Sequence, residues 1–143
     1  RDGLARHGLP ADVIKGCFPV AGVYNLDPAW LPADTVLATI FPDLFDNVAD
    51  AQTYSPINHV AGNTTPFLIS WGDADTQYVL ESSEDLIAAL ADQPGPVERQ
   101  VWPGYNHFDA HRTLENIDDP WVVTLRDWMS SPVKSAAKSA AAG

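Results

Sequence analysis

The sequence is poor in cysteine and in positive charge, and it contains no long hydrophobic run. Its single cysteine, Cys17, excludes an internal disulfide framework and a zinc site built from several cysteines. Eight lysine and arginine residues stand against 19 aspartate and glutamate residues, which gives a net charge of -11. This charge argues against binding to nucleic acid and to an anionic membrane surface. No apolar segment approaches the roughly 20 residues that cross a bilayer.

What the chain does contain is the composition of one folded domain. Hydrophobic residues make up 45% and aromatic residues 10% of the sequence, which is typical of a globular protein. A length of 143 residues is enough for one domain with its own core. We assign this domain to residues 1–132. The remaining segment 133–143, rich in alanine and serine, has no apolar face and is predicted to be a disordered tail.

Apolar runs alternate with helical patterns along the chain. The runs at residues 13–24 and 66–72 predict strands buried on both faces of a parallel sheet, and the more alternating run at 97–102 predicts a strand nearer the edge. Apolar residues at helical spacing predict one helix around residues 83–90 and a second from about 120 to 129. Strands that alternate with helices predict an α/β fold, in which helices flank a parallel sheet.

Residues 27–56 form a long insertion between the first two predicted strands. A connection of this length is usually functional or contains a small helical excursion, and we expect it near the active site. It holds several prolines and the aromatic residues Trp30, Phe41, Phe45 and Tyr54. These aromatic side chains are expected mainly to pack within the protein. The alternative is that they line an acyl or aryl pocket.

Two polar clusters follow the second and third predicted strands. They are "GDADT" at residues 72–76 and "GYNHF" at residues 104–108. The carboxyl ends of adjacent parallel strands lie at one edge of a sheet, so an aspartate of the first cluster and His107 can meet there. A carboxylate on one imidazole nitrogen fixes the tautomer and leaves the other nitrogen free to take a proton from a nucleophile.

Two other interpretations of His107 compete with this pairing. His107 and His111 are four residues apart, a spacing that can hold a metal ion on a helix, but the metalloprotease pattern needs glutamate where Phe108 stands. His107 can also be a polar loop residue without chemistry. His7 and His59 are expected to be surface residues.

The order of these motifs along the chain resembles that of a known family. "SPINHVAGNTTPFLISWGDADTQYV" followed by "VWPGYNHFD" resembles the second half of an α/β-hydrolase of the esterase/lipase superfamily. "VAGVYNLDP" at residues 20–28 resembles the kynurenine formamidase-like esterases. The likeness covers about residues 10–130. It implies that Asp75 is the acid of a catalytic triad, with Asp73 as its rival, and that His107 is the general base. It implies neither a cofactor nor a metal.

One part of the family pattern is missing from this chain. The nucleophile elbow Gly-x-Ser-x-Gly occurs nowhere, and neither does the glycine-rich oxyanion segment. Cys17, inside a strand-like run, is expected to be inert. The first predicted strand also has no neighbour on its far side. We therefore expect the nucleophile on an N-terminal half of the same domain, preceding Arg1. The serines that lack the flanking glycines are Ser55, Ser70, Ser82 and Ser83.

These observations predict a serine hydrolase of carboxylesterase type. Its substrate would be a small-molecule ester or a small amide such as an aryl formamide, and its partner would be the N-terminal half that carries the serine. The alternative is a non-catalytic, hydrolase-like protein used for binding or assembly. A Gly-x-Ser-x-Gly motif in the N-terminal half, or its loss, separates the two hypotheses.

Overall fold

The computed structural model of the chain describes residues 2–10, 13–31, 33, 35–112 and 115–131. The predicted tail at 133–143 lies outside these ranges. The elements, in chain order, are α1 (Asp2–Arg6), α2 (Val36–Leu44), α3 (Val48–Tyr54), the 3₁₀ helix η1 (Pro56–His59), β1 (Phe67–Gly72), α4 (Gln77–Ala91), β2 (Val97–Trp102), α5 (Asp109–Arg112) and α6 (Pro120–Ser130).

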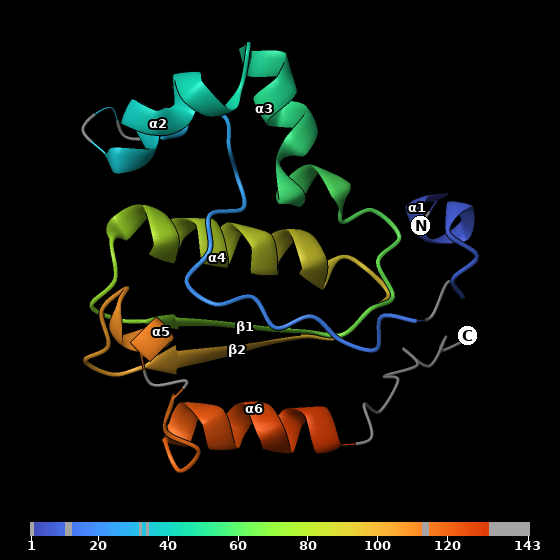
Figure 1. Cartoon of the computed structure of the whole chain (residues 1–143), viewed down its shortest axis with the longest axis vertical. Coiled ribbons are helices and arrows are strands. Elements are labelled where there is room, and N and C mark those ends of the chain that lie inside the picture. Colours follow the sequence, from blue (N-terminus) through green and yellow to red (C-terminus); the bar gives the residue numbers. More distant parts are fainter. Residues whose placement is uncertain (1, 11–12, 32, 34, 113–114, 132–143) are drawn as a thin grey trace, which may run out of the picture.

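The elements form layers around a small parallel sheet (Figure 1). Helix α4 covers one face of the sheet, α6 covers the other, and α2 and α3 lie beyond α4. The strands β1 and β2 pair in parallel, in a register that runs from Phe67 opposite Val97 to Gly72 opposite Trp102. In the described part of the chain, no helix is both long and apolar enough to cross a membrane.

The strand predicted at residues 13–24 does not form as a continuous strand, which corrects the expectation. A shorter stretch still pairs in parallel with the free side of β1. Cys17 N–H donates to Pro66 C=O at 2.9 Å, and Ala21 N–H donates to Ser70 C=O at 2.8 Å. Between them, Pro19 accepts from Ser70 N–H but has no N–H of its own to donate. The ladder is therefore interrupted at Pro19, and two isolated bridges remain.

The predicted helices are present, and the insertion is helical. Helix α4 begins at Gln77, earlier than the pattern indicated, and α6 spans Pro120–Ser130, where Asp119 accepts a hydrogen bond from Trp121 N–H at 2.9 Å. Within residues 27–56, α2 and α3 each begin after a polar cap. Thr35 and Asn47 accept hydrogen bonds from backbone N–H groups in the first turns of these two helices.

A turn at Ala21 leads the chain out of the sheet and onto α4. Ala21 has φ of 46°, in the left-handed region that is unfavourable for a residue with a Cβ. Three residues later, Tyr24 N–H donates to the buried Ser82 Oγ of α4 at 2.7 Å. Burial raises the pKa of the Tyr24 phenol to about 12. This turn therefore connects the interrupted ladder to the core on the α4 side.

The side chains of β1 alternate between two packed faces. Ile69 and Trp71 belong to the core on the α4 side, together with Val79, Leu86 and Leu90. On the α6 side, two tryptophans converge on one buried serine.

Ser70, which is fully buried, accepts hydrogen bonds from two indole N–H groups. Nε1 of Trp102 lies 2.7 Å from Ser70 Oγ, and Nε1 of Trp121 lies 3.3 Å from it. One hydroxyl therefore satisfies the polar atoms of two large buried side chains, one from β2 and one from α6. Phe18 packs on the same α6 face, with its ring centroid 5.3 Å from that of Trp121.

Replacing Ser70 by alanine should lower the free energy of unfolding by about 2–4 kcal/mol, because two buried indole N–H groups lose their acceptor. The matched control is Ser130→Ala. Ser130 is exposed on α6 and donates only to the Arg126 carbonyl of its own helix. Urea unfolding of the full-length protein, monitored by circular dichroism, measures both variants. Equal stabilities of Ser70→Ala and the parent protein would contradict this account of the core.

Candidate active site

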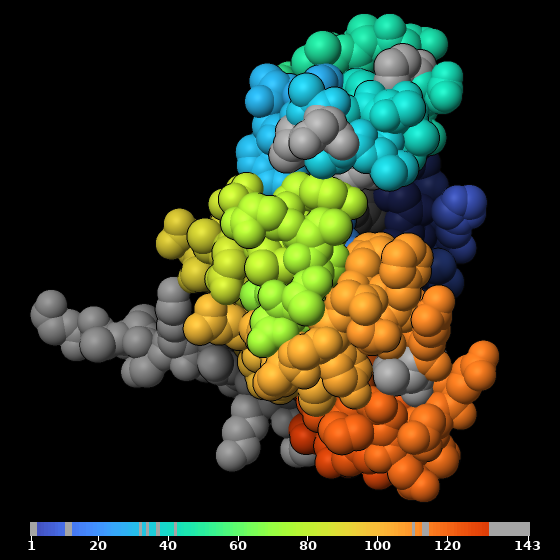
Figure 2. All heavy atoms as spheres, turned by 90° about the vertical axis from the view of Figure 1, so that its left-hand side faces the viewer, coloured from blue at the N-terminus to red at the C-terminus, as the bar shows by residue number. Residues whose placement is uncertain are grey.

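The carboxyl ends of β1 and β2 support two loops that are bonded to each other. Asp73 N–H donates to Trp102 C=O at 3.1 Å, and Ala74 N–H donates to Tyr105 C=O at 3.1 Å. These bonds continue the parallel pairing past the last residues of the two strands. Figure 2 faces this end of the sheet, where yellow-green atoms of the first turns of α4 lie beside orange atoms of the second loop.

Gly72 permits the close approach of these loops. A Cβ at position 72 would lie 1.9 Å from the carbonyl oxygen of Tyr105, far inside any tolerated contact. Gly104, which has φ of 77°, turns the second loop back toward the first. The two glycines therefore have separate tasks. Gly72 admits the backbone of the partner loop, and Gly104 supplies the left-handed turn.

The structure places His107 against Asp75. Nδ1 of His107 lies 3.2 Å from Oδ1 and 3.2 Å from Oδ2 of Asp75. The Asp75 side chain is fully buried, whereas 37% of the His107 side chain is exposed. No residue in the described part of the chain hydrogen-bonds to the other ring nitrogen, Nε2. The imidazole is thus held through Nδ1 by a buried carboxylate, while its side chain stays partly exposed.

Asp75 is held by its neighbour as well as by the histidine. Its Oδ1 accepts from Thr76 N–H at 2.6 Å and from Thr76 Oγ1 at 3.3 Å. Thr76 is the N-cap of α4, so the carboxylate also lies at the positive end of that helix. These donors offset part of the cost of burying a carboxylate.

Asp73, the rival for the acid, has a different position. Its Oδ1 accepts from Gly104 N–H at 2.6 Å, and the residue is exposed. The Asp73 carboxylate therefore ties its loop to a backbone N–H of the second loop and accepts no hydrogen bond from the imidazole. Of the two aspartates in this turn, Asp75 is the one that geometry pairs with His107.

Two residues beside His107 have a structural role that the sequence argument did not identify. Asn106 Oδ1 accepts from Phe108 N–H at 2.9 Å and from Asp109 N–H at 3.2 Å. In return, Asp109 Oδ2 accepts from Asn106 N–H at 3.0 Å. This reciprocal arrangement resembles a capping box and starts α5 directly after the histidine. The spacing of Asn106 and Asp109 was the signal for it in the sequence.

The other candidate residues do not join this pair. The ring centroid of His111 lies 5.3 Å from that of His107, but the described residues contain no group of three or more His, Cys, Asp or Glu side chains that could hold a metal ion. His7 and His59 are exposed, and His59 Nε2 contacts the carbonyl of Thr53. Burial raises the pKa of the Cys17 thiol, which disfavours the reactive thiolate.

The four serines considered as nucleophiles are fully buried. Ser55 Oγ donates to Ala51 C=O and accepts from Leu26 N–H, while Ser70 and Ser82 accept the hydrogen bonds described above. Ser83 Oγ has no hydrogen-bond partner in the described part of the chain. Because they are buried, these four serines belong to the protein core.

Comparison with known proteins assigns the chain to a family. The model of the prolyl oligopeptidase family matches residues 11–134. The chain belongs to the prolyl oligopeptidase family. No curated protein matches the chain.

Two solved structures resemble the fold. A puromycin-hydrolyzing peptidase of Mycobacterium tuberculosis is similar with a TM-score of 0.54 and 18% identity, over 80% of this chain and 22% of that protein. The thermophilic esterase Est2 of the Planctomycetes species Thermogutta terrifontis is similar with a TM-score of 0.58 and 16% identity, over 88% of this chain and 45% of that protein. These likenesses confirm the predicted fold, part of an α/β-hydrolase. The chain spans less than half of either protein.

Gly72→Ala should separate the two loops, because the added methyl group would overlap the Tyr105 carbonyl. We expect the hydrogen bond between His107 and Asp75 to be lost. In the parent protein this bond should give a downfield Nδ1 proton resonance in NMR spectra, and the variant should lack it. The control is Gly3→Ala, where an added Cβ meets nothing within 4 Å. A retained downfield resonance in Gly72→Ala would show that the close approach does not hold the pair.

Proposed function

We propose that this protein is a serine hydrolase in which Asp75 and His107 are two members of a Ser-His-Asp triad. The observation that carries the proposal is the contact of 3.2 Å between His107 Nδ1 and the buried Asp75 carboxylate at the carboxyl ends of parallel strands. The membership in the prolyl oligopeptidase family supports it. The serine would come from an N-terminal half of the same domain.

In this proposal the two residues act by moving one proton. Asp75 accepts the Nδ1–H of His107 and so fixes the tautomer with a lone pair on Nε2. Nε2 takes the proton of the serine hydroxyl as its oxygen adds to the acyl carbon, and it returns the proton to the leaving group when the bond to that group breaks. Water then repeats the sequence and releases the acid. Backbone N–H groups of the N-terminal half would stabilise the oxyanion.

The substrate we propose is a small-molecule ester or a small amide. The triad chemistry supports either, since both are acyl transfers to water. The likeness of "VAGVYNLDP" to kynurenine formamidase-like esterases suggests carboxylesterase-type activity that includes aryl formamides. The family name and the similar puromycin-hydrolyzing peptidase favour a second candidate, the amide bond of a short peptide. The scheme requires no cofactor or metal.

The pairing of the interrupted ladder supports the proposed N-terminal half as the partner. Cys17 and Ala21 turn their backbone groups toward β1, whereas the N–H groups of Phe18 and Val20 have no hydrogen-bond partner in the described part of the chain. An additional parallel strand would satisfy this edge. The similar solved structures are more than twice as long as the part that this chain matches.

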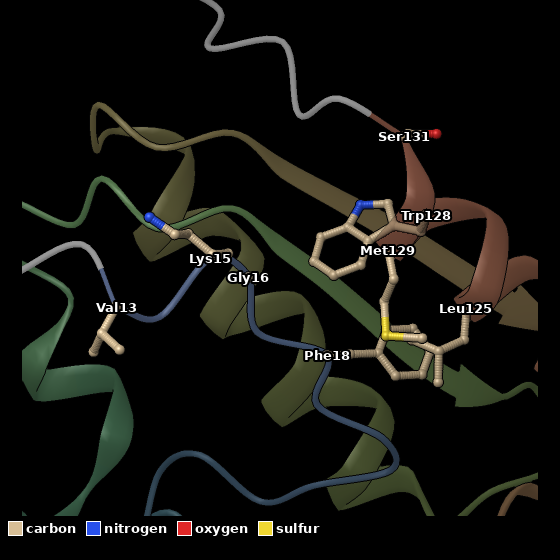
Figure 3. A pocket seen from close by; sticks show the side chains of 8 residues that line it. All are labelled: Val13, Lys15, Gly16, Phe18, Leu125, Trp128, Met129 and Ser131. Carbon is tan, nitrogen blue, oxygen red and sulfur yellow. The ribbon is translucent and has the colours of Figure 1, made fainter.

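A groove beside this edge supports the same partner. The groove has a volume of about 620 Å³ and lies between the edge segment and α6 (Figure 3). It is lined by Val13, Lys15, Gly16, Phe18, Leu125, Trp128, Met129 and Ser131. Phe18 and Trp128 offer aromatic surface, and Val13 and Met129 are exposed apolar side chains. An apolar segment adjoining the new strand would cover them.

A non-catalytic, hydrolase-like protein for binding or assembly remains the rival hypothesis. The sequence of the N-terminal half distinguishes the two. A Gly-x-Ser-x-Gly elbow at the end of the neighbouring strand supports the enzyme, and its loss supports the binding protein.

In the full-length protein, His107→Ala should lower kcat by about 10⁴- to 10⁶-fold, and Asp75→Asn should lower it somewhat less, since triad residues act as a unit. The measurement is hydrolysis of a p-nitrophenyl ester and of an aryl formamide. His111→Ala, to which we assign no chemistry, serves as the comparison and should cost less than about tenfold. EDTA should have no effect. Equal losses in His107→Ala and His111→Ala, together with EDTA sensitivity, would favour a metal site instead.

Residues 1–143 expressed alone should not give a soluble, active monomer. The free edge at Phe18 and Val20 lacks its strand, and no elbow serine is present. The test is expression, size-exclusion chromatography and a p-nitrophenyl ester assay, with the full-length protein as the positive control. Turnover that survives purification of the isolated chain, and that a serine-directed phosphonate abolishes, would refute the need for an N-terminal half.

A further inference from the structure

An exposed aromatic side chain and a cation adjoin His107. The Phe108 ring centroid lies 5.7 Å from that of His107, edge to face, and 64% of Phe108 is exposed. The Arg112 guanidinium carbon lies 5.9 Å from the centre of the Phe108 ring. Arg112 N–H also donates to Phe108 C=O at 3.0 Å, so one helical turn places the guanidinium over the ring. Two successive contacts thus connect the imidazole to a positive charge.

This guanidinium has unused hydrogen-bonding capacity. Arg112 is exposed, and it forms no ion pair with a carboxylate of the described residues, whereas Arg99 and Arg126 pair with Glu84 and Asp127. A guanidinium that lies over an aromatic ring still has N–H donors that can bind a carboxylate. In a chain with a net charge of -11, this cation close to the proposed triad histidine therefore stands out as a binding group.

We infer that Arg112 binds an anionic group, a carboxylate, on the leaving group of the substrate. The inference rests on the proposed function and names the part of the substrate that the site selects. His107 delivers its proton to the leaving group, so the leaving group must lie against the loop that carries His107. Arg112 ends the short helix α5 that directly follows this loop, four residues after Phe108. A carboxylate a few bonds from the scissile ester or amide can reach it.

The inference selects between kinds of leaving group. For an amide substrate, the leaving group would be an amino acid with a free carboxylate, as at the C-terminus of a short peptide. For an ester, it would be a hydroxy acid. Phe108 acts as a positioning residue, because its ring orients the guanidinium without contacting the scissile bond.

The test uses two probes with the same acyl group, 3-acetoxybenzoate and its methyl ester, in the full-length protein. Arg112→Gln should lower kcat/KM for 3-acetoxybenzoate roughly 3- to 10-fold, the range for a partly exposed, charge-assisted contact. It should change kcat/KM for the methyl ester less than about twofold. Arg112→Lys should restore part of the loss. Phe108→Leu should give an intermediate loss on the charged probe.

A control variant and a binding measurement distinguish failure of this inference from failure of the proposed function. Arg126→Gln removes an exposed arginine on α6 and should affect neither probe. Equal losses on both probes in Arg112→Gln would show a structural role and overturn the inference. If neither probe is hydrolysed by the parent protein, the proposed function fails. Calorimetric binding of the product 3-hydroxybenzoate then still decides the inference, because equal affinities of the parent protein and Arg112→Gln overturn it.

Discussion

The approach of the Gly72 backbone to the Tyr105 carbonyl is the constraint on which the site depends. It brings the loops after β1 and β2 closer together than any side chain at position 72 would allow. The hydrogen bonds from Asp73 to Trp102 and from Ala74 to Tyr105 then fix the relative register of the two loops. His107 comes two residues after Tyr105 and Asp75 three residues after Gly72. The position of the imidazole relative to the carboxylate is therefore set mainly by backbone, not by flexible side chains.

The features predictable from the sequence were those with local signals. The apolar runs located β1 and β2, helical spacing located α4 and α6, and the rule for parallel sheets brought the Asp75 and His107 loops to one edge. The interrupted strand pairing of residues 13–24 was not predictable in this way. Its composition is that of a buried strand, but Pro19 cannot donate to the ladder and Ala21 takes a left-handed turn. The hydrophobicity of a segment indicates that it is buried, but it does not indicate these restrictions on its backbone.

The assignment of the aspartates shows a second limit of sequence reasoning. Asp73 and Asp75 stand in the same turn, two residues apart, and both are chemically able to pair with an imidazole. The difference arises from which backbone N–H each one meets: Gly104 for Asp73 and Thr76 for Asp75. Only the folded loops determine these neighbours. The family resemblance pointed to Asp75 by motif position, and in the folded loops Asp75 is the aspartate that contacts His107.

Helix α4 connects the protein core to the pair formed by Asp75 and His107. Its buried face, with Val79, Leu86 and Leu90, packs against Ile69 and Trp71 of β1 and so fixes where the helix begins. The first N–H groups of a helix have no partner within the helix, and its dipole is positive at that end. The Asp75 carboxylate lies there and is bonded to Thr76 N–H, so its burial is stabilised by the helix that the core positions. A carboxylate beside Nδ1 in turn favours the imidazole tautomer that keeps its proton on that nitrogen. Apolar packing between α4 and β1 thus contributes, through the start of one helix, to the orientation of the His107 ring against Asp75.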